Sequence, residues 1–284
     1  METKLTSRIG ALPDTWSFIK QDFASEKANL NNIMFGSSEY IKDGLFYNAI
    51  NLKSGKIVDK RMSDNFGYNL NAYYTVYLVD VAEKYRDAAL KTLGSLKGNY
   101  EKFLWEGSSG TGSADGYADA IEGAINIFNR EAVPGADDWI DSEIQEMWTK
   151  QQESGIIEGW HGDGNFARTT LIYCLWKTQG VTIEPWREDV KFGAVAENGK
   201  IYLSIEADSE WEGKIIFDTP RHKTNLNMPF DWPRINQIPE WFTVEKDQNY
   251  KIKLDGQTTK YTGSKMSDGI NLQIAPGQNM LTIY

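Results

Sequence analysis

The spacing of apolar residues divides the chain into two parts. Up to about residue 180, apolar residues recur every three or four positions, which is the period of amphipathic helices. Asp14 is a candidate N-cap of the first helix, and Gly155 and Gly180 follow the last two, where glycine commonly ends a helix. We expect seven helical segments, near residues 16–33, 40–52, 66–81, 84–104, 114–128, 139–148 and 165–177.

From about residue 185 onward, the apolar positions alternate with polar ones, as in half-buried strands. Ile201, Leu203 and Ile205 follow this pattern, and shorter alternations cover residues 250–254, 272–274 and 281–283. The dipeptide Asn198-Gly199 lies between two such runs and predicts a tight hairpin turn. We therefore expect an α+β multidomain fold, with an α/α-hairpin domain over residues 1–184 and an antiparallel β-sandwich over residues 185–284.

Three of the predicted helix starts share an order of aspartate, glycine and aromatic residue. Their aspartates are Asp64, Asp115 and Asp163, which are 51 and then 48 residues apart. Two helices and two loops fit into each interval, a repeat that is typical of helical solenoids and closed toroids. Since alternate helices run parallel, the three helix starts should lie at one end of the helical layer and converge on one rim. The plain alternative is that each aspartate only caps its helix.

The third helix start is the richest in chemical groups. His161 titrates near neutral pH and can donate or accept a proton, and Trp160 offers an indole ring. Asn165 opens the predicted helix, and Arg168, about one turn later, has the geometry to hold a carboxylate. In the preceding repeat, Glu122 follows Asp115 by seven residues and lies on the same helix face, either in the site or as a structural glutamate. There, Asp119 and Glu122 are spaced as neighbours.

Composition narrows the classes of function. The net charge of −10 argues against a general nucleic-acid binder. The longest apolar run, Leu171–Trp176, is far shorter than the ~18 residues of a membrane-spanning helix, and Cys174 within it is expected to be buried. One cysteine and two histidines exclude a multi-cysteine metal site and a zinc site of three histidines. The first ten residues are polar and charged, unlike a secretory leader, so we expect a cytoplasmic protein or, if a leader was removed, a periplasmic one.

Ten tryptophans and fourteen tyrosines are an excess that suits a large core, and sugar-binding clefts also use such rings as stacking platforms. The segments 64–68, 113–124 and 159–168 resemble those of the six-hairpin glycosidase superfamily, in particular bacterial proteins with an (α/α)6 toroid followed by a C-terminal β-sandwich. The segment from Pro220 to Phe242 resembles that sandwich. Such proteins are common in polysaccharide-degrading bacteria.

The resemblance implies a glycoside hydrolase that needs no metal or cofactor and acts on an oligosaccharide or polysaccharide, with β-glucuronidase-like, uronic-acid-cleaving relatives favoured. Six hairpins of about 50 residues need about 300 residues, whereas the predicted helical part ends near residue 180. The chain therefore looks like the C-terminal part of such an enzyme. An open half-ring exposes an apolar flank, which predicts association with a second copy or with a partner chain that completes the toroid.

Glycoside hydrolysis requires one protonated carboxyl group and a second carboxylate that acts as base or nucleophile. We assign this pair to Asp115 and Asp163, with Glu122 in reserve and His161 tuning one of them or donating the proton in its place. The expected substrate-binding residues, which stack on the sugar or orient its polar groups, are Asp64, Tyr68, Tyr117, Trp160, Asn165 and Arg168.

Two other functions are compatible with the same residues. One is a uronide lyase, in which His161 with Tyr117 or Tyr173 removes the proton next to the sugar carboxylate. The other is a non-catalytic carbohydrate-binding or assembly module made of an incomplete ring. The loop from Arg221 to Arg234 either reaches the rim or packs between the domains, and the packing role is favoured.

Overall fold

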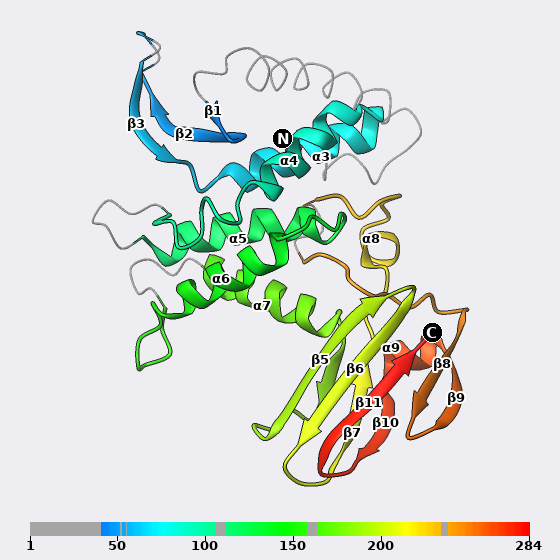
Figure 1. Ribbon diagram of the computed structural model, residues 1–284. Helices are drawn as coiled ribbons and strands as arrows, with labels where there is room; N and C mark the ends of the chain where they lie inside the picture. The colour runs from blue at the N-terminus through cyan, green and yellow to red at the C-terminus, as the bar shows by residue number, and fades with distance from the viewer. Residues whose placement is uncertain (1–40, 52, 55, 106–111, 158–163, 234–237) are drawn as a thin grey trace. The chain divides into compact units, whose positions relative to one another are not determined.

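The fold is α+β. The computed structural model describes residues 41–51, 53–54, 56–105, 112–157, 164–233 and 238–284, which form helices and three antiparallel sheets (Figure 1). The chain divides into two compact units, Met1–Leu171 with Trp232–Gln237, and Ile172–Asp231 with Ile238–Tyr284. The helices that the structure describes are all too short or too polar to cross a lipid bilayer.

The helices of the first unit pack in sequence order. Helix α3 packs against α4 and α5, and α5 packs against α6 (Figure 1). The last helix, α7, begins in this unit and ends in the second. The bounds of these helices are α3 Phe66–Asp80, α4 Glu83–Gly94, α5 Ala114–Phe128, α6 Ala136–Trp148 and α7 Asn165–Thr178.

Three fully buried aromatic rings form the centre of the helical unit. Phe66 lies 5.3 Å from Trp105 and 6.2 Å from Trp139, and the two indoles are 6.3 Å apart, edge to face, measured between ring centroids. Each indole also donates a hydrogen bond, Trp105 to Glu143 at 3.1 Å and Trp139 to the Tyr100 carbonyl at 3.1 Å. Burying the rings while satisfying their polar atoms fixes α3 and α6 against the segment that contains Trp105.

One helical prediction is wrong and a second is wrong in part. The segment near residues 40–52 forms strands β1 (Ile41–Lys42) and β2 (Leu45–Ile50), which pair antiparallel with each other, while β2 also pairs with β3 (Ile57–Met62). Asp43 and Gly44 have φ of 55° and 86°, a turn that a helix cannot contain. The helix expected over 84–104 ends at Gly94. The expected helix near 16–33 and its cap Asp14 lie outside the described residues.

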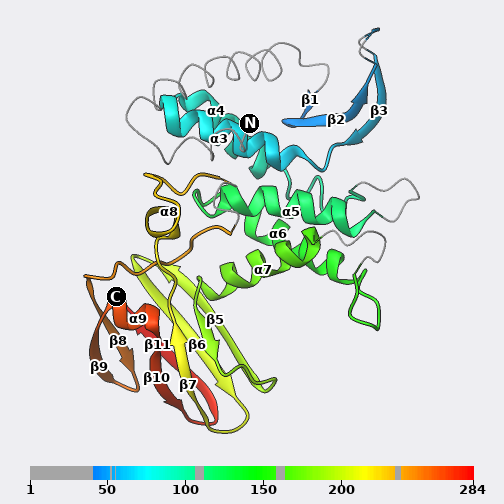
Figure 2. The same ribbon diagram turned by 180° about the vertical axis from the view of Figure 1, so that it is seen from behind.

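The second unit holds two antiparallel sheets. One has the order β10-β7-β4 and the other β5-β6-β11-β8-β9 (Figure 2). Its two short helices are α8 Arg221–Thr224 and α9 Gly263–Asp268. The strands are β4 Thr182–Glu184, β5 Val190–Glu197, β6 Lys200–Ala207, β7 Trp211–Ile216, β8 Asn249–Leu254, β9 Gln257–Thr262, β10 Ile270–Ile274 and β11 Gly277–Ile283.

The alternating residues of the second unit point into one hydrophobic core shared by both sheets. Ile201, Leu203 and Ile205 of β6 are buried together with Ile215 of β7 and Ile270 of β10. The predicted hairpin turn is confirmed. Asn198 and Gly199 both have positive φ, 51° and 72°, and Glu197 pairs with Lys200 across the turn.

The side chain of Cys174 is exposed, so the prediction of a buried thiol is wrong. The apolar run Leu171–Trp176 spans more than one turn of α7, so its side chains point to different sides of the helix and cannot all be buried. Ile172 and Tyr173 are buried, whereas Leu171, three residues before Cys174 and on the same side of the helix, is also exposed.

Candidate active site

Helices α3 and α5 touch backbone to backbone at Gly67 and Gly123. A Cβ atom placed on Gly67 would lie 2.2 Å from the Cα of Gly123, and one placed on Gly123 would lie 2.1 Å from the Cα of Gly67. The buried amide of Asn71 donates to the carbonyl of Gly67 at 2.7 Å and to that of Gly123 at 3.3 Å. Two glycines at one crossing and a shared amide therefore hold the two helices at an unusually short distance.

This close crossing brings Tyr68 of α3 to Asp119 of α5. The Tyr68 hydroxyl donates a short hydrogen bond to Oδ1 of Asp119, whose side chain is almost fully buried. Asn165, the first residue of α7, donates from Nδ2 to the same Asp119 oxygen at 3.2 Å and to Oδ1 of Asp115 at 2.8 Å. Side chains from three helices thus meet around two carboxyl groups one turn apart on α5.

Arg168 and Glu122 close the cluster on the side of α7. Nε and Nη2 of Arg168 donate to Oε2 of Glu122 at 2.9 and 2.6 Å, and Nη2 also donates to Oδ1 of Asn165 at 2.6 Å. Glu122 is only 2% exposed, so its charge needs this partner. The Thr169 hydroxyl donates to the carbonyl of Ala118 at 3.2 Å and holds α7 against α5. The guanidinium of Arg168 is therefore bonded to other residues of the cluster, Glu122 and Asn165.

The carboxyl group of Asp119 has a strongly raised pKa. Burial raises its pKa to about 6, the hydrogen bond from Tyr68 acts in the opposite direction, and the nearby carboxyl groups of Asp115, Asp64 and Glu122 raise it further. A carboxyl group with this pKa carries a proton for part of the time near neutral pH. Asp119 can therefore act as a general acid.

The caps of α3 and α5 do not use the two repeat aspartates. Ser113 is the N-cap of α5, and its hydroxyl accepts from the Gly116 amide at 3.0 Å. The N-cap of α3 is Asn65, which makes no side-chain cap bond. Its amide instead donates to Oδ1 of Asp64 at 2.6 Å. Capping therefore does not explain Asp115, which lies in the first turn of α5 and binds Asn165.

The structure brings together six of the predicted site residues and separates one from them. Tyr117 is fully buried away from the cluster, with the Lys150 ammonium 5.0 Å from its ring centre. Burial raises the pKa of its hydroxyl, and Glu143 and Glu146 add to this effect. Three predicted residues, Trp160, His161 and Asp163, lie outside the described residues. Five of the six are joined to one another or to Asp119 by hydrogen bonds, namely Tyr68, Asp115, Glu122, Asn165 and Arg168. The sixth, Asp64, lies near enough to raise the pKa of Asp119.

Asp119 is the residue that the sequence-based assignment missed. Its spacing to Asp115 and Glu122, four residues after one and three before the other, places all three on one helix face. That spacing was the available signal, but it does not show that α3 supplies a hydroxyl to the middle residue. Among the described residues, no group of three or more His, Cys, Asp or Glu side chains is arranged to hold a metal ion.

No protein-family model, curated protein or solved structure matches this chain.

Proposed function

We propose that this chain is a carbohydrate-active enzyme that hydrolyses O-glycosidic bonds by carboxylate catalysis, with Asp119 as the proton donor. The observation that carries this proposal is that the side-chain amide of Asn165 donates hydrogen bonds to two carboxyl groups, those of Asp115 and Asp119. Asp119 is buried and has a pKa raised to about 6, while Asp115 accepts a hydrogen bond from the same Asn165 nitrogen. Asp119 would protonate the leaving oxygen, and Asp115 would act on the anomeric carbon.

The short separation of the two carboxyl groups favours retention of configuration. Oxygens of both groups lie within 3.2 Å of the same nitrogen, which leaves less room than the about 6.5–9.5 Å that inverting enzymes need for a water molecule. Asp115 is then the nucleophile. This revises the assignment of Asp115 and Asp163 as the catalytic pair, and Asp163 stays a predicted neighbour of the site.

The repeat supports a helical toroid of the six-hairpin glycosidase type. The hydrogen bond between Tyr68 and Asp119 joins residues 51 positions apart, and so does the bond between Thr169 and the carbonyl of Ala118. Equal offsets between successive odd-numbered helices are what an α/α-hairpin repeat of about 50 residues produces. We propose that the first unit is part of such a toroid and that the second, with two sheets on one core, is a β-sandwich.

The charges around Asp119 favour a neutral sugar over a uronic acid. Asp64, Asp115 and Glu122 all act on Asp119 electrostatically, so a sugar carboxylate would meet carboxyl groups on several sides. Arg168, the residue expected to hold a sugar carboxylate, already binds Glu122 and Asn165. We therefore expect neutral glycosides to be turned over in preference to glucuronides.

The test is a panel of nitrophenyl glycosides and glucuronides with the full chain, Asp115→Asn, Asp119→Asn and the control Asp137→Asn. Asp137 is an exposed aspartate in the first turn of α6. We expect wild type and Asp137→Asn to release nitrophenol equally and Asp115→Asn to lose turnover. Asp119→Asn should lose turnover on the matching disaccharide, whose leaving oxygen needs a proton, and both variants should keep an unchanged circular dichroism spectrum. Full activity of Asp115→Asn on the nitrophenyl glycoside, or of Asp119→Asn on the disaccharide, would remove that residue from the mechanism. An unsaturated product that absorbs in the ultraviolet would identify a lyase instead.

A further inference from the structure

The second unit contains a cavity that is built from its own residues alone. Its volume is about 310 Å³, at the lower end of the range for small-molecule sites. The cavity lies where the last turns of α7, strand β4, the end of β7 and helix α9 come together. Its lining residues are Leu175, Gly180, Thr182, Ile216, Phe217, Asp218, Thr219, Arg221, Ile238 and Ser267.

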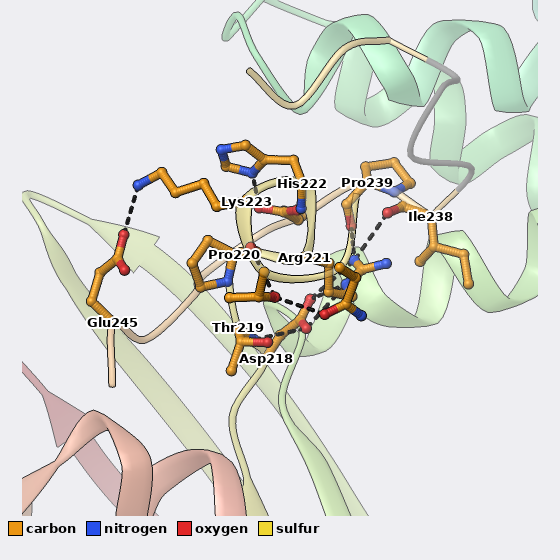
Figure 3. A network of polar contacts seen from close by, with 12 residues as sticks. Asp218, Thr219, Pro220, Arg221, His222, Lys223, Ile238, Pro239 and Glu245 are labelled. Atoms are coloured by element: carbon orange, nitrogen blue, oxygen red, sulfur yellow. Dashed lines mark hydrogen bonds and ion pairs between the residues drawn. The ribbon is translucent and has the colours of Figure 1, made fainter. Parts of the chain in front are cut away.

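Hydrogen bonds between distant segments fix the walls of this cavity. The amide of Phe217 donates to the carbonyl of Met266 in α9 at 3.1 Å, and the amide of Val244 donates to the carbonyl of Asp218 at 2.8 Å. Arg221 donates from Nη2 to the carbonyls of Ile238 and Pro239 at 2.9 and 3.3 Å (Figure 3). A cavity with walls held in this way is preformed, which lowers the entropic cost of binding.

The charged groups of the cavity neutralise each other. Nε of Arg221 lies 3.1 Å from both carboxylate oxygens of Asp218, and its Nη2 group lies 3.0 Å from Oδ2 (Figure 3). Arg221 is the one basic residue and Asp218 the one acidic residue among the lining residues. Since each already has an opposite charge beside it, the cavity offers no net charge to an anion or a cation, and a neutral ligand suits it best.

The remaining lining residues combine apolar surface with hydroxyl groups. Leu175, Ile216 and Ile238 supply partly exposed apolar side chains, and the Thr219 hydroxyl makes no hydrogen bond within the described part of the chain. The Ser267 hydroxyl donates to the carbonyl of Ser264 at 3.0 Å, so its oxygen can still accept. A ligand that matches these groups needs an apolar face and several hydroxyl groups on a small frame.

We propose that this cavity binds a neutral pyranose ring, as a carbohydrate-binding site of the second unit. The ring's C–H face packs on Leu175, Ile216 and Ile238, and its hydroxyl groups bond to Thr219, Ser267 and the fixed Asp218–Arg221 pair. The proposal does not depend on the glycosidase activity of the first unit, because every lining residue belongs to the second.

The test titrates the full chain with glucose, galactose, mannose and xylose, and with sodium glucuronate and inorganic phosphate as charged probes, and follows binding by NMR or calorimetry. Thr182→Trp fills the cavity from the exposed edge strand β4, and Thr219→Val removes the unbonded hydroxyl without changing size. Thr258→Trp and Thr258→Val, at an exposed threonine of β9, are the matched controls.

We expect at least one neutral sugar to bind the wild-type chain and both Thr258 variants alike. Thr182→Trp should abolish this binding, and Thr219→Val should weaken it about 2- to 10-fold, which is the effect of one hydrogen bond. The proposal is overturned if no neutral sugar binds, if a charged probe binds better, or if Thr219→Val and Thr182→Trp both bind as wild type does. Thr219→Val keeps the test valid should Thr182→Trp fail to fold.

Discussion

Gly67 and Gly123 face each other across the crossing of α3 and α5, and there is no space for a methyl group on either. Gly67→Ala should force the helices apart, with a loss of about 1–3 kcal/mol in the free energy of unfolding, the usual cost of overpacking. The hydrogen bond between Tyr68 and Asp119 should be lost with it. Chemical denaturation and enzymatic turnover measure the two effects.

Gly94→Ala is the matched control for this substitution. Gly94 ends α4, and a Cβ there would meet only Val133 at 3.4 Å. We expect no loss of stability from Gly94→Ala, because alanine is a better helix former than glycine. Equal stability of the Gly67→Ala and wild-type proteins would show that the two backbones are not in contact.

Asp119→Asn should stabilise the protein at pH 7 while it removes turnover. The folded protein raises the pKa of Asp119 from 3.8 to about 6, so this residue contributes no penalty below about pH 4, where it is protonated in both states. As pH rises from about 4 to 6, the unfolded chain loses the proton first and folding becomes less favourable. Asparagine cannot ionise, so the gain should reach about 2–3 kcal/mol above pH 6.

Thermal unfolding at pH 4 and at pH 7 measures this difference, with Asp137→Asn as the control. The variant and wild type should have similar stability at pH 4, and the gain should appear at pH 7 alone. A stability gain of the same size at both values would assign the effect to packing. The proposed pKa shift would then be wrong.

Tyr68→Phe should move the pH profile of turnover. The Tyr68 hydroxyl bonds to Asp119 and lowers the pKa of that carboxyl, so its removal should raise the pKa above about 6. The alkaline limb of kcat/KM, which reports loss of the donor's proton, should shift to higher pH. Tyr74→Phe is the control, because Tyr74 lies on the same helix but donates to Glu131 at 2.9 Å. An unchanged limb in Tyr68→Phe would contradict the role of Asp119.

Arg168→Met should destabilise the protein strongly, because it removes the cationic partner of Glu122, which is buried. Breaking such a pair typically costs about 3–5 kcal/mol. The double variant Glu122→Leu/Arg168→Met should recover most of this loss, since no carboxylate is then left without its partner. Arg61→Met, at an exposed pair with Asp59, should have no measurable effect. A small effect of Arg168→Met on stability with a large rise in KM would instead place Arg168 on the substrate.

Much of the helical unit could be predicted because its apolar periods are long. The helices beginning at Phe66, Ala114 and Asn165 start where the sequence places them. The segment 41–50 could not be assigned in the same way, because a short apolar run fits a strand as well as a helix. The decisive local signal was Asp43-Gly44, a turn dipeptide inside the expected helix.

The site could be predicted as a set of residues but not as a geometry. The repeat brought Asp115, Tyr68 and Asn165 into one group, yet it gave no reason to prefer Asp119 as the proton donor. That preference arises from the burial of Asp119, which raises its pKa and depends on how the helices pack in the folded protein. Arg168 was expected to hold the substrate, because the sequence alone does not show that it forms an ion pair with Glu122.

The most direct test of the central claim compares leaving groups in Asp119→Asn. A proton donor matters only when the leaving oxygen needs a proton, so the variant should lose about 10²–10⁴-fold in kcat/KM on a methyl glycoside or a disaccharide of the preferred sugar. On the 2,4-dinitrophenyl glycoside or the glycosyl fluoride, whose leaving groups depart unprotonated, it should remain close to wild type. An equal loss on both kinds of substrate, or no loss on either, would contradict the assignment of Asp119 as the general acid.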